Sequence, residues 1–485
     1  MRVLVAIANY GTKNDVYLER LLTEYRSLPY RVDLVVLSNL AKDLGPDVEV
    51  RVGLPDRDPW SLPFGHKQLF ADRRDDYDLF IYSEDDMLIG RRQIEAFLEV
   101  TPSLPDDQIA GFLQYEEDAQ GRRHCPAVHT FCHWVPGSVR QYGSEVYAYL
   151  TNEHAACYLL TRAQLQRALA SGGFLVPPHK GFYDLLCTAA TDPYTQCGFT
   201  KVLCLTRIED FLVYHLPNKY IGKGGLTFAQ VQDQMQALLR CRNGELTRAE
   251  LLGPQERPSV CRWSKSYCEP VRPDVLAAVP REAKQVLSVG CGAGVTEAVL
   301  VQQGIRVVAI PLDAVVGVTA RSHGLEVLEP SFPEAFARLQ GERFDGILLT
   351  DLLPYVPDPE ALLGRCGSLL AEQGRLVVTA PSFHFLGHWK KSWADRRWRR
   401  AQGILTGRPR HSTTPRRVAG WLRRSGLCVD RIRYEETSRF HGLVKGSLGL
   451  AGPYLSHTFT ITAGLRTRNP IQDASADPCL ATASK

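Results

Sequence analysis

At 485 residues the chain is too long for one ordinary hydrophobic core, which predicts two or three domains. The hydrophobic fraction of 44% is normal for a globular protein, and the net charge of +4 is too small to indicate a nucleic-acid partner by itself. The 13 cysteines are scattered and odd in number, and no apolar run is long enough to span a bilayer, so we expect a cytoplasmic protein with reduced thiols.

The first predicted elements form a βαβ unit. Residues 2–8 are a nearly continuous apolar run, which predicts a buried strand and leaves no room for a signal peptide. Residues 16–25 have helical spacing, and residues 32–39 are a second apolar run that ends in polar residues. We expect the ends of these strands, with Asn9 after the first, to form a nucleotide pocket.

Three consecutive acids, Glu84, Asp85 and Asp86, follow the next predicted strand at residues 78–82. Carboxylates clustered at a strand end repel one another unless a cation neutralises them, and a divalent ion there could stabilise a departing diphosphate. A charged turn that caps a helix beginning near Arg91 explains the same pattern. Lys67, in the preceding helix, could meet a diphosphate or lie on a solvated helix face.

The acidic stretch resembles the Asp-x-Asp-type signature of GT-A glycosyltransferases, in its Glu-Asp-Asp form, and the resemblance covers roughly the first half of the chain. It implies transfer of a sugar from a nucleotide-sugar donor with manganese or magnesium. By position it makes Asp86 the direct metal ligand. Glu84 and Asp85 would face the ribose and sugar of the donor, or reach the metal through water.

The same resemblance gives roles to residues elsewhere in the first half. Asn9 lies where the base and ribose are held, Asp184 where inverting enzymes place the catalytic base, and His215 where a histidine completes the metal shell. A base would accept the proton of the attacking hydroxyl. Other interpretations stay open: Asp184 as an acid at a helix N-terminus, Glu209-Asp210 as rival base, and His215 as a structural histidine.

A proline-rich stretch at residues 241–275 predicts a linker to a second α/β domain. A strand, a glycine turn and a helix start follow at residues 285–297, and further strands are predicted at 306–310, 344–353 and 375–381. The succession, with Ser-Val-Gly-Cys-Gly-Ala-Gly at residues 288–294, resembles class I S-adenosylmethionine-dependent methyltransferases, which have a Rossmann-like fold.

This second resemblance implies that Gly290, Gly292 and Gly294 hold the methionine end of S-adenosylmethionine. It also implies that Asp313 bonds the ribose hydroxyls, although in the family this acid usually ends the second strand. Asp351 would line the methyl-transfer mouth.

A base for methyl transfer to a hydroxyl is not identified cleanly by the sequence. The candidates are His384, Tyr355 and His411, each of which could equally be structural. Residues 384–433 form an insertion that begins with tryptophans among lysines and arginines. It could attract an anionic acceptor or the inner face of a membrane, contact nucleic acid, or be a solvated helix.

We therefore expect two α/β domains: a GT-A-like, nucleotide-sugar-binding domain at residues 1–240 and a methyltransferase domain at 276–465, followed by a disordered tail at 466–485. The main hypothesis is a bifunctional enzyme that adds a sugar and methylates that sugar or its neighbour on a glycan, glycolipid or metabolite. The alternatives are a methyltransferase with a catalytically inactive sugar-binding domain and, with less support, an RNA-binding factor.

Overall fold

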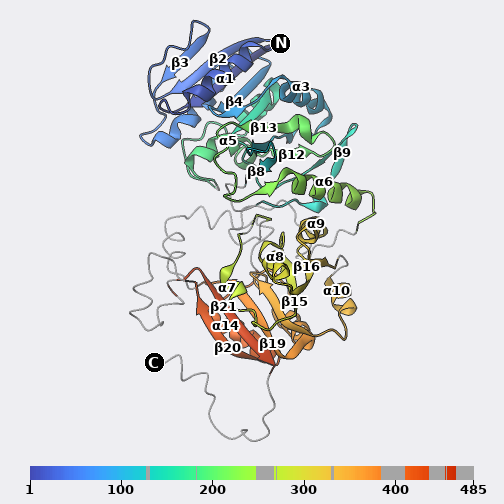
Figure 1. The fold of residues 1–485 in the computed structure, drawn as a ribbon. Coiled ribbons are helices and arrows are strands. Elements are labelled where there is room, and N and C mark those ends of the chain that lie inside the picture. Colours follow the sequence, from blue (N-terminus) through green and yellow to red (C-terminus); the bar gives the residue numbers. More distant parts are fainter. Residues whose placement is uncertain are drawn as a thin grey trace, which may run out of the picture. The chain divides into compact units, whose positions relative to one another are not determined.

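The computed structural model describes residues 1–126, 132–181, 183–246, 267–268, 270–328, 332–383, 410–435, 454 and 456–465. The chain divides into two units, Met1–Arg242 and Asn243–Lys485 (Figure 1). His384 and the residues 466–485 lie outside the described residues, as do the tryptophans expected in the basic insertion.

The first unit is organised around a five-stranded sheet of order β11-β4-β1-β2-β3. The first four strands in sequence run parallel, and β11 is antiparallel to β4. The central strand β1 is buried from Val3 to Asn9, as expected of a parallel strand covered on both faces. The bounds are β1 Arg2–Asn9, β2 Arg31–Ser38, β3 Val48–Val52, β4 Leu79–Glu84 and β11 Cys157–Thr161.

This unit has two further sheets, of five and four strands, and the five-stranded one carries the predicted histidine. Its order is β14-β8-β7-β13-β5, and β13 is antiparallel to β5 with His215 opposite Met87. The bounds are β5 Met87–Leu88, β7 Leu113–Glu117, β8 Arg123–Cys125, β13 Leu212–His215 and β14 Leu226–Thr227. The other sheet, β6-β12-β10-β9, consists of β6 Gln108–Ala110, β9 Arg140–Tyr142, β10 Glu145–Ala148 and β12 Thr200–Cys204.

Most predicted helices of this unit are confirmed. The helix expected at residues 16–25 is α1, and the one expected near Arg91 is α3. Thr161 caps α4 through a capping box with Gln164. The bounds are α1 Asp15–Arg26, α2 Gly65–Asp72, α3 Arg91–Val100, α4 Arg162–Ala170, α5 Leu185–Thr195 and α6 Phe228–Arg242, with short 3-10 helices η1 Pro59–Phe64, η2 Thr101–Ser103, η3 Pro136–Ser138 and η4 Ile208–Phe211.

The second unit has a seven-stranded sheet of order β17-β16-β15-β18-β19-β21-β20. Of its strands only β21 runs against its neighbours, and it lies between β19 and β20. The bounds are β15 Gln285–Cys291, β16 Arg306–Pro311, β17 Glu326–Val327, β18 Phe344–Thr350, β19 Leu370–Pro381, β20 Leu427–Tyr434 and β21 Thr458–Leu465. The described helices are α7 Pro273–Leu276, α8 Val295–Gln302, α9 Ala314–Ser322, α10 Phe332–Arg338, α11 Pro359–Leu369 and α14 Pro415–Arg424.

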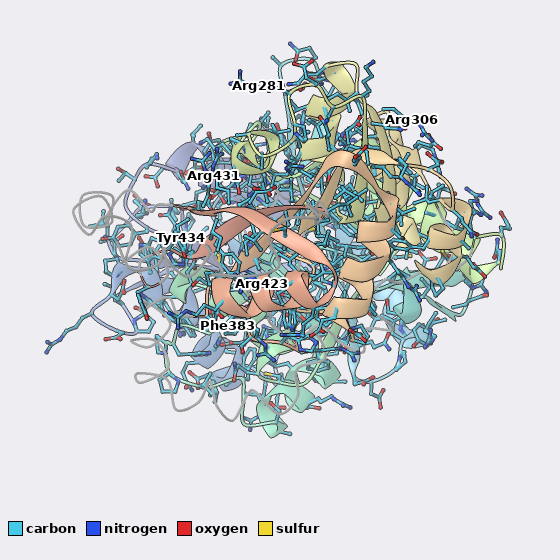
Figure 2. All side chains as sticks on the ribbon, turned by 90° about the horizontal axis from the view of Figure 1, so that it is seen from below. Arg281, Arg306, Phe383, Arg423, Arg431 and Tyr434 are labelled. Carbon is cyan, nitrogen blue, oxygen red and sulfur yellow. The ribbon has the colours of Figure 1, made fainter. Side chains whose placement is uncertain are left out.

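Helix α14 lies in the described part of the basic insertion, residues 410–433. Thr414 caps it and Pro415 is its first residue, a position where proline is favoured. Its apolar side chains are buried and its arginines are exposed; Figure 2 shows Arg423 on α14 and Arg431 on β20. Within the described ranges, no helix has the length and apolar character needed to cross a membrane.

Candidate functional site

The acidic stretch lies at the carboxyl end of β4, beside the end of β1. Asp85 is buried and its two carboxylate oxygens accept hydrogen bonds from Nδ2 of Asn9 at 2.8 Å and Nδ2 of Asn14 at 2.7 Å. Burial and the neighbouring Asp86 raise the pKa of Asp85 to about 6, against the two amides, which lower it. Asp85 therefore holds the Nδ2 group of the Asn9 side chain. The buried Oδ1 of Asn9 has no hydrogen-bond partner among the described residues.

Asp86 and His215 come together, as the sequence predicts. Nε2 of His215 lies 3.3 Å from Oδ2 of Asp86, and Nδ1 of the same ring contacts Glu116. Burial lowers the pKa of His215, but the two carboxylates outweigh it and raise the pKa above its ordinary value. Burial raises the pKa of Asp86, but the hydrogen bond and charge of His215, together with Lys219, outweigh burial and keep that pKa below its ordinary value. Nζ of Lys219 lies 3.7 Å from the same Asp86 oxygen.

Glu84 is the third acid of the stretch, and its Oε1 is buried without a hydrogen-bond partner in the described part of the chain. Burial, followed by the charges of Asp86 and Asp85, raises the pKa of Glu84 well above its ordinary value. The Glu84 carboxyl group therefore keeps its proton more readily than an exposed glutamate does, and a bound cation would oppose this effect. Among the described residues no group of three histidine, cysteine, aspartate or glutamate side chains is arranged to hold a metal ion.

Asp184 is exposed and caps the N-terminus of α5, which agrees with its interpretation as an acid at a helix N-terminus. Its Oδ1 accepts a hydrogen bond from the amide of Cys187 at 2.9 Å, and its charge also acts on Glu84. The rival acids are engaged elsewhere: Glu209 forms two hydrogen bonds with Arg123, and Asp210 bonds Arg92 and Arg207. Of the candidates for a base, only Asp184 is near the acidic stretch by these contacts.

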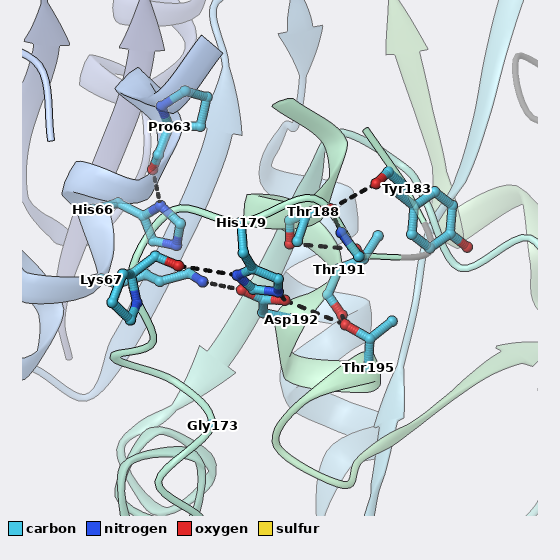
Figure 3. Close-up of polar contacts among 12 residues, drawn as sticks. Pro63, His66, Lys67, Gly173, His179, Tyr183, Thr188, Thr191, Asp192 and Thr195 are labelled. Atoms are coloured by element: carbon cyan, nitrogen blue, oxygen red, sulfur yellow. Dashed lines mark hydrogen bonds and ion pairs between the residues drawn. The ribbon is translucent and has the colours of Figure 1, made fainter. Parts of the chain in front are cut away.

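The expectation for Lys67 is wrong in both of its forms. Lys67 is buried, and its Nζ donates to Oδ2 of Asp192 and lies 4.3 Å from the centre of the Phe64 ring. Figure 3 shows Lys67 and His179 converging on Asp192. Because Asp192 belongs to α5, the helix that Asp184 caps, this ion pair ties α2 to α5 and fixes the position of that cap.

In the second unit the glycine turn follows β15 and begins α8. Gly290 and Gly294 have φ values of +72° and +76°, a region that favours glycine. A Cβ atom on Gly294 would also lie 3.0 Å from Leu325. Gly294 is the N-cap residue of α8, so the amide groups of the first turn of α8, which have no partner within the helix, lie next to the glycine turn.

Asp313 does not have free carboxylate oxygens. Its Oδ1 accepts hydrogen bonds from the amides of Val315 and Val316 at the start of α9, and its Oδ2 accepts one of 2.7 Å from the hydroxyl of Tyr267. Burial raises the pKa of Asp313 to about 6, against these hydrogen bonds. The expected contact with two ribose hydroxyls therefore competes with the Tyr267 hydroxyl for Oδ2, because three of the roughly four acceptor positions of the carboxylate are already used.

We expect Asp313→Asn to gain stability relative to the natural chain, by about 1–3 kcal/mol, as the pH rises from about 4 to about 7. The unfolded carboxyl group loses its proton near pH 4, whereas the folded one keeps it up to about pH 6. The stability that a raised pKa contributes is complete below pH 4 and is lost as the pH rises through 6, and asparagine cannot ionise. Urea denaturation across this pH range checks the prediction. Asp358→Asn, at the exposed cap of α11, controls for loss of a capping carboxylate. The prediction would be contradicted if the difference in free energy of unfolding between Asp313→Asn and the natural chain did not change with pH.

Asp351 follows β18 and has a φ of +50°, which is uncommon for a residue with a side chain. Its Oδ1 accepts a hydrogen bond from Oγ1 of Thr379 at 2.9 Å, and its Oδ2 accepts one from Arg272 at 3.0 Å. Among the proposed bases, His411 contacts the backbone carbonyl of Val356 and stacks edge-on against Trp421, which is a structural role.

Several residues of these sites carry no sequence signal. The sequence predictions omit Asn14, Glu116, Tyr267, Arg272 and Thr379, which hold the predicted acids and histidine in place. For Asp313 a signal existed, since an aspartate immediately before a helix is a typical cap.

The family model that matches this chain covers part of its second half. A family model described as "Methyltransferase domain" matches residues 263–432. The chain is 33% identical over 175 residues to a ubiquinone biosynthesis O-methyltransferase of Xylella fastidiosa (strain 9a5c), covering 34% of this chain and 71% of the relative. It is 35% identical over 116 residues to the enzyme of that name in Xanthomonas campestris pv. campestris (strain B100), covering 23% and 48%.

Solved structures give weaker similarities. A SAM-dependent methyltransferase from Archaeoglobus fulgidus aligns with 39% of this chain and 90% of its own, at 16% identity and a TM-score of 0.30. Magnesium protoporphyrin IX methyltransferase from Synechocystis PCC 6803, solved with bound SAH, aligns with 37% and 73%, at 16% identity and a TM-score of 0.27.

Proposed function

Through its second unit the chain belongs to the S-adenosylmethionine-dependent methyltransferases, and on this premise we propose that it methylates a hydroxyl group of its acceptor. The cofactor supplies an activated methyl group on a sulfonium centre. The proposal of oxygen as the methylated atom rests on the relatives, which are named O-methyltransferases. We propose that the class of reaction is shared, and that the acceptor is a glycan, glycolipid or metabolite.

The glycine turn is the observation that carries this proposal. Gly290 and Gly294 hold φ values that let backbone amides approach a ligand, and Gly294 has no room for a side chain. Gly292 lies between them in the same turn. These residues fit the methionine end of the cofactor, and Asp351, one strand away at the end of β18, fits a place beside it.

Titration calorimetry of the full chain with S-adenosylmethionine and S-adenosylhomocysteine tests the proposal. We expect one molecule of either compound to bind per chain. Absence of binding to a folded chain, as judged by circular dichroism, would overturn it.

We propose a second function for the first unit: transfer of a sugar from a nucleotide-sugar, as the GT-A resemblance implies. The supporting observation is that Asp86 and His215, 129 positions apart in sequence, lie 3.3 Å apart beside two further acids. Asp86 and His215 would hold a manganese or magnesium ion, with diphosphate oxygens completing its shell. Glu116 would orient the histidine ring from behind, as second-layer carboxylates do at metal sites.

The other residues near Asp86 and His215 have separate tasks under this proposal. Asn9 offers its unused Oδ1 to the donor, with Asp85 holding its amide, and Glu84 lines the sugar side. Asp184 would accept the proton of the attacking hydroxyl through the carboxylate oxygen that does not cap α5. An ion held by Asp86 and His215 would offset the negative charge of a departing diphosphate.

A screen of nucleotide-sugars for manganese-dependent thermal stabilisation of the full chain tests this second proposal. Stabilisation by one nucleotide class, lost on adding a chelator, would support it. If no nucleotide-sugar stabilises the chain with manganese, the first unit is a degenerate module and methyl transfer is the only activity. If both activities exist, their fusion raises the concentration of the glycosylated product at the methylating site.

A further inference from the structure

Asp351 is held in its unusual backbone conformation by two side chains from distant parts of the chain. Its amide donates to the carbonyl oxygen of Thr379 at 3.0 Å, and the Thr379 hydroxyl donates to Oδ1 at 2.9 Å. Nη1 of Arg272 donates to Oδ2 at 3.0 Å. Residues with side chains adopt a positive φ at an energetic cost, so such positions persist where the surroundings over-determine them.

Arg272 connects four elements at this end of the sheet. Its Nε and Nη2 form a bidentate pair with Asp274 at 2.9 and 2.8 Å, and its amide donates to Oγ1 of Thr296 at 3.0 Å. Asp274 in turn accepts a hydrogen bond from Thr460 of β21. The Arg272 side chain is only 17% exposed, so its charge depends on these two carboxylates.

The location of this cluster points to the cofactor. Thr296 is in the first turn of α8, immediately after the glycine turn, and Asp351 follows β18, the neighbour of β15. A carboxylate can accept about four hydrogen bonds, whereas the side chain of Asp351 accepts two from the described residues and is 25% exposed. Its unused acceptor sites suit a cationic ligand such as the ammonium group at the methionine end of the cofactor.

We propose that Arg272, assisted by Thr379, is a positioning residue that aims the Asp351 carboxylate at the methionine end of S-adenosylmethionine. The proposal rests on the methyltransferase function of the second unit. Arg272 itself need not touch the cofactor, because its guanidinium group is committed to Asp274 and Asp351.

Calorimetry with S-adenosylhomocysteine tests the proposal without a known acceptor. We expect Arg272→Met and Asp351→Asn each to weaken binding by about tenfold or more, because each removes a hydrogen bond to or from a charged group. The double variant should bind no more weakly than Asp351→Asn alone, since Arg272 acts only through Asp351. Arg272→Lys, which keeps the charge but loses the planar fork, should lie between Arg272→Met and the natural chain.

Arg306→Met is the matched control. Arg306, labelled in Figure 2, also bridges two carboxylates, those of Glu326 and Glu342, but it lies at the amino end of β16. We expect it to leave the affinity for S-adenosylhomocysteine unchanged. If Arg272→Met does not fold, Thr379→Val removes the other side-chain hydrogen bond to the Asp351 carboxylate, the one at Oδ1, and should also weaken binding.

Two results would overturn the proposal: full affinity in Arg272→Met, or effects of Arg272→Met and Asp351→Asn that add in the double variant. These results are distinct from failure of the proposed function. In that case the natural chain itself would not bind S-adenosylhomocysteine.

Discussion

Asp86→Ala is expected to reduce manganese-dependent cleavage of the nucleotide-sugar donor by at least about a hundredfold while methyl transfer from the second unit continues. The substitution removes the carboxylate that faces Nε2 of His215, and a single imidazole is a poor site for a hard cation. The measurement is release of nucleotide from the donor selected by the thermal screen, with and without a chelator, alongside S-adenosylhomocysteine affinity.

Asp210→Ala is the control for this prediction. It removes an acid of the same unit that is paired with Arg92 and Arg207 and is not part of the acidic stretch at residues 84–86. We expect it to keep manganese-dependent activity, because surface ion pairs contribute little. If Asp86→Ala were as active as Asp210→Ala, the glycosyltransferase proposal would fail and the methyltransferase with a sugar-binding module would remain.

Gly294→Val should abolish measurable binding of S-adenosylhomocysteine, a loss of at least about a hundredfold. A residue branched at Cβ is strained by about 1–2 kcal/mol or more at a φ of +76°, and its Cβ would press on Leu325 at 3.0 Å and Ala320 at 3.4 Å. The turn must therefore move, and with it the amides that begin α8. Calorimetry at high protein concentration gives the readout.

Gly304→Val separates this effect from simple destabilisation. Gly304 has a φ of +83° and open space around its Cα, so valine there brings comparable backbone strain without a clash and away from the turn. We expect Gly304→Val to unfold at a lower temperature than the natural chain but to bind S-adenosylhomocysteine with the same affinity. Equal affinities in the two variants would show that the turn does not hold the cofactor.

The sequence predicts local features well because they depend on neighbouring residues. Apolar runs locate β1, β15, β16 and β18, and glycine spacing locates the turn before α8. It also predicts that Asp86 and His215 meet, through a family resemblance rather than through periodicity. The methyltransferase half is established by comparison with relatives, whereas the GT-A half remains a proposal.

The partners of these residues are missed because they come from distant segments. Glu116 is 99 positions from His215, and Arg272 is 79 positions from Asp351, so their pairing depends on strand order that no local pattern encodes. Lys67 is mistaken for a surface residue for the same reason: the acid that neutralises it is 125 positions away. A charged residue is usually exposed unless such a partner exists.

The placement of β21 has a consequence for how the second unit is assembled. Strand β20 pairs with β21 and not with β19, although it precedes β21 in the chain. During synthesis, β20 therefore has no strand to pair with until β21 has been made and has inserted between β19 and β20. The hydrogen bond from Thr460 to Asp274 also forms only after that point, so the sheet of the second unit is complete only once β21 has been made.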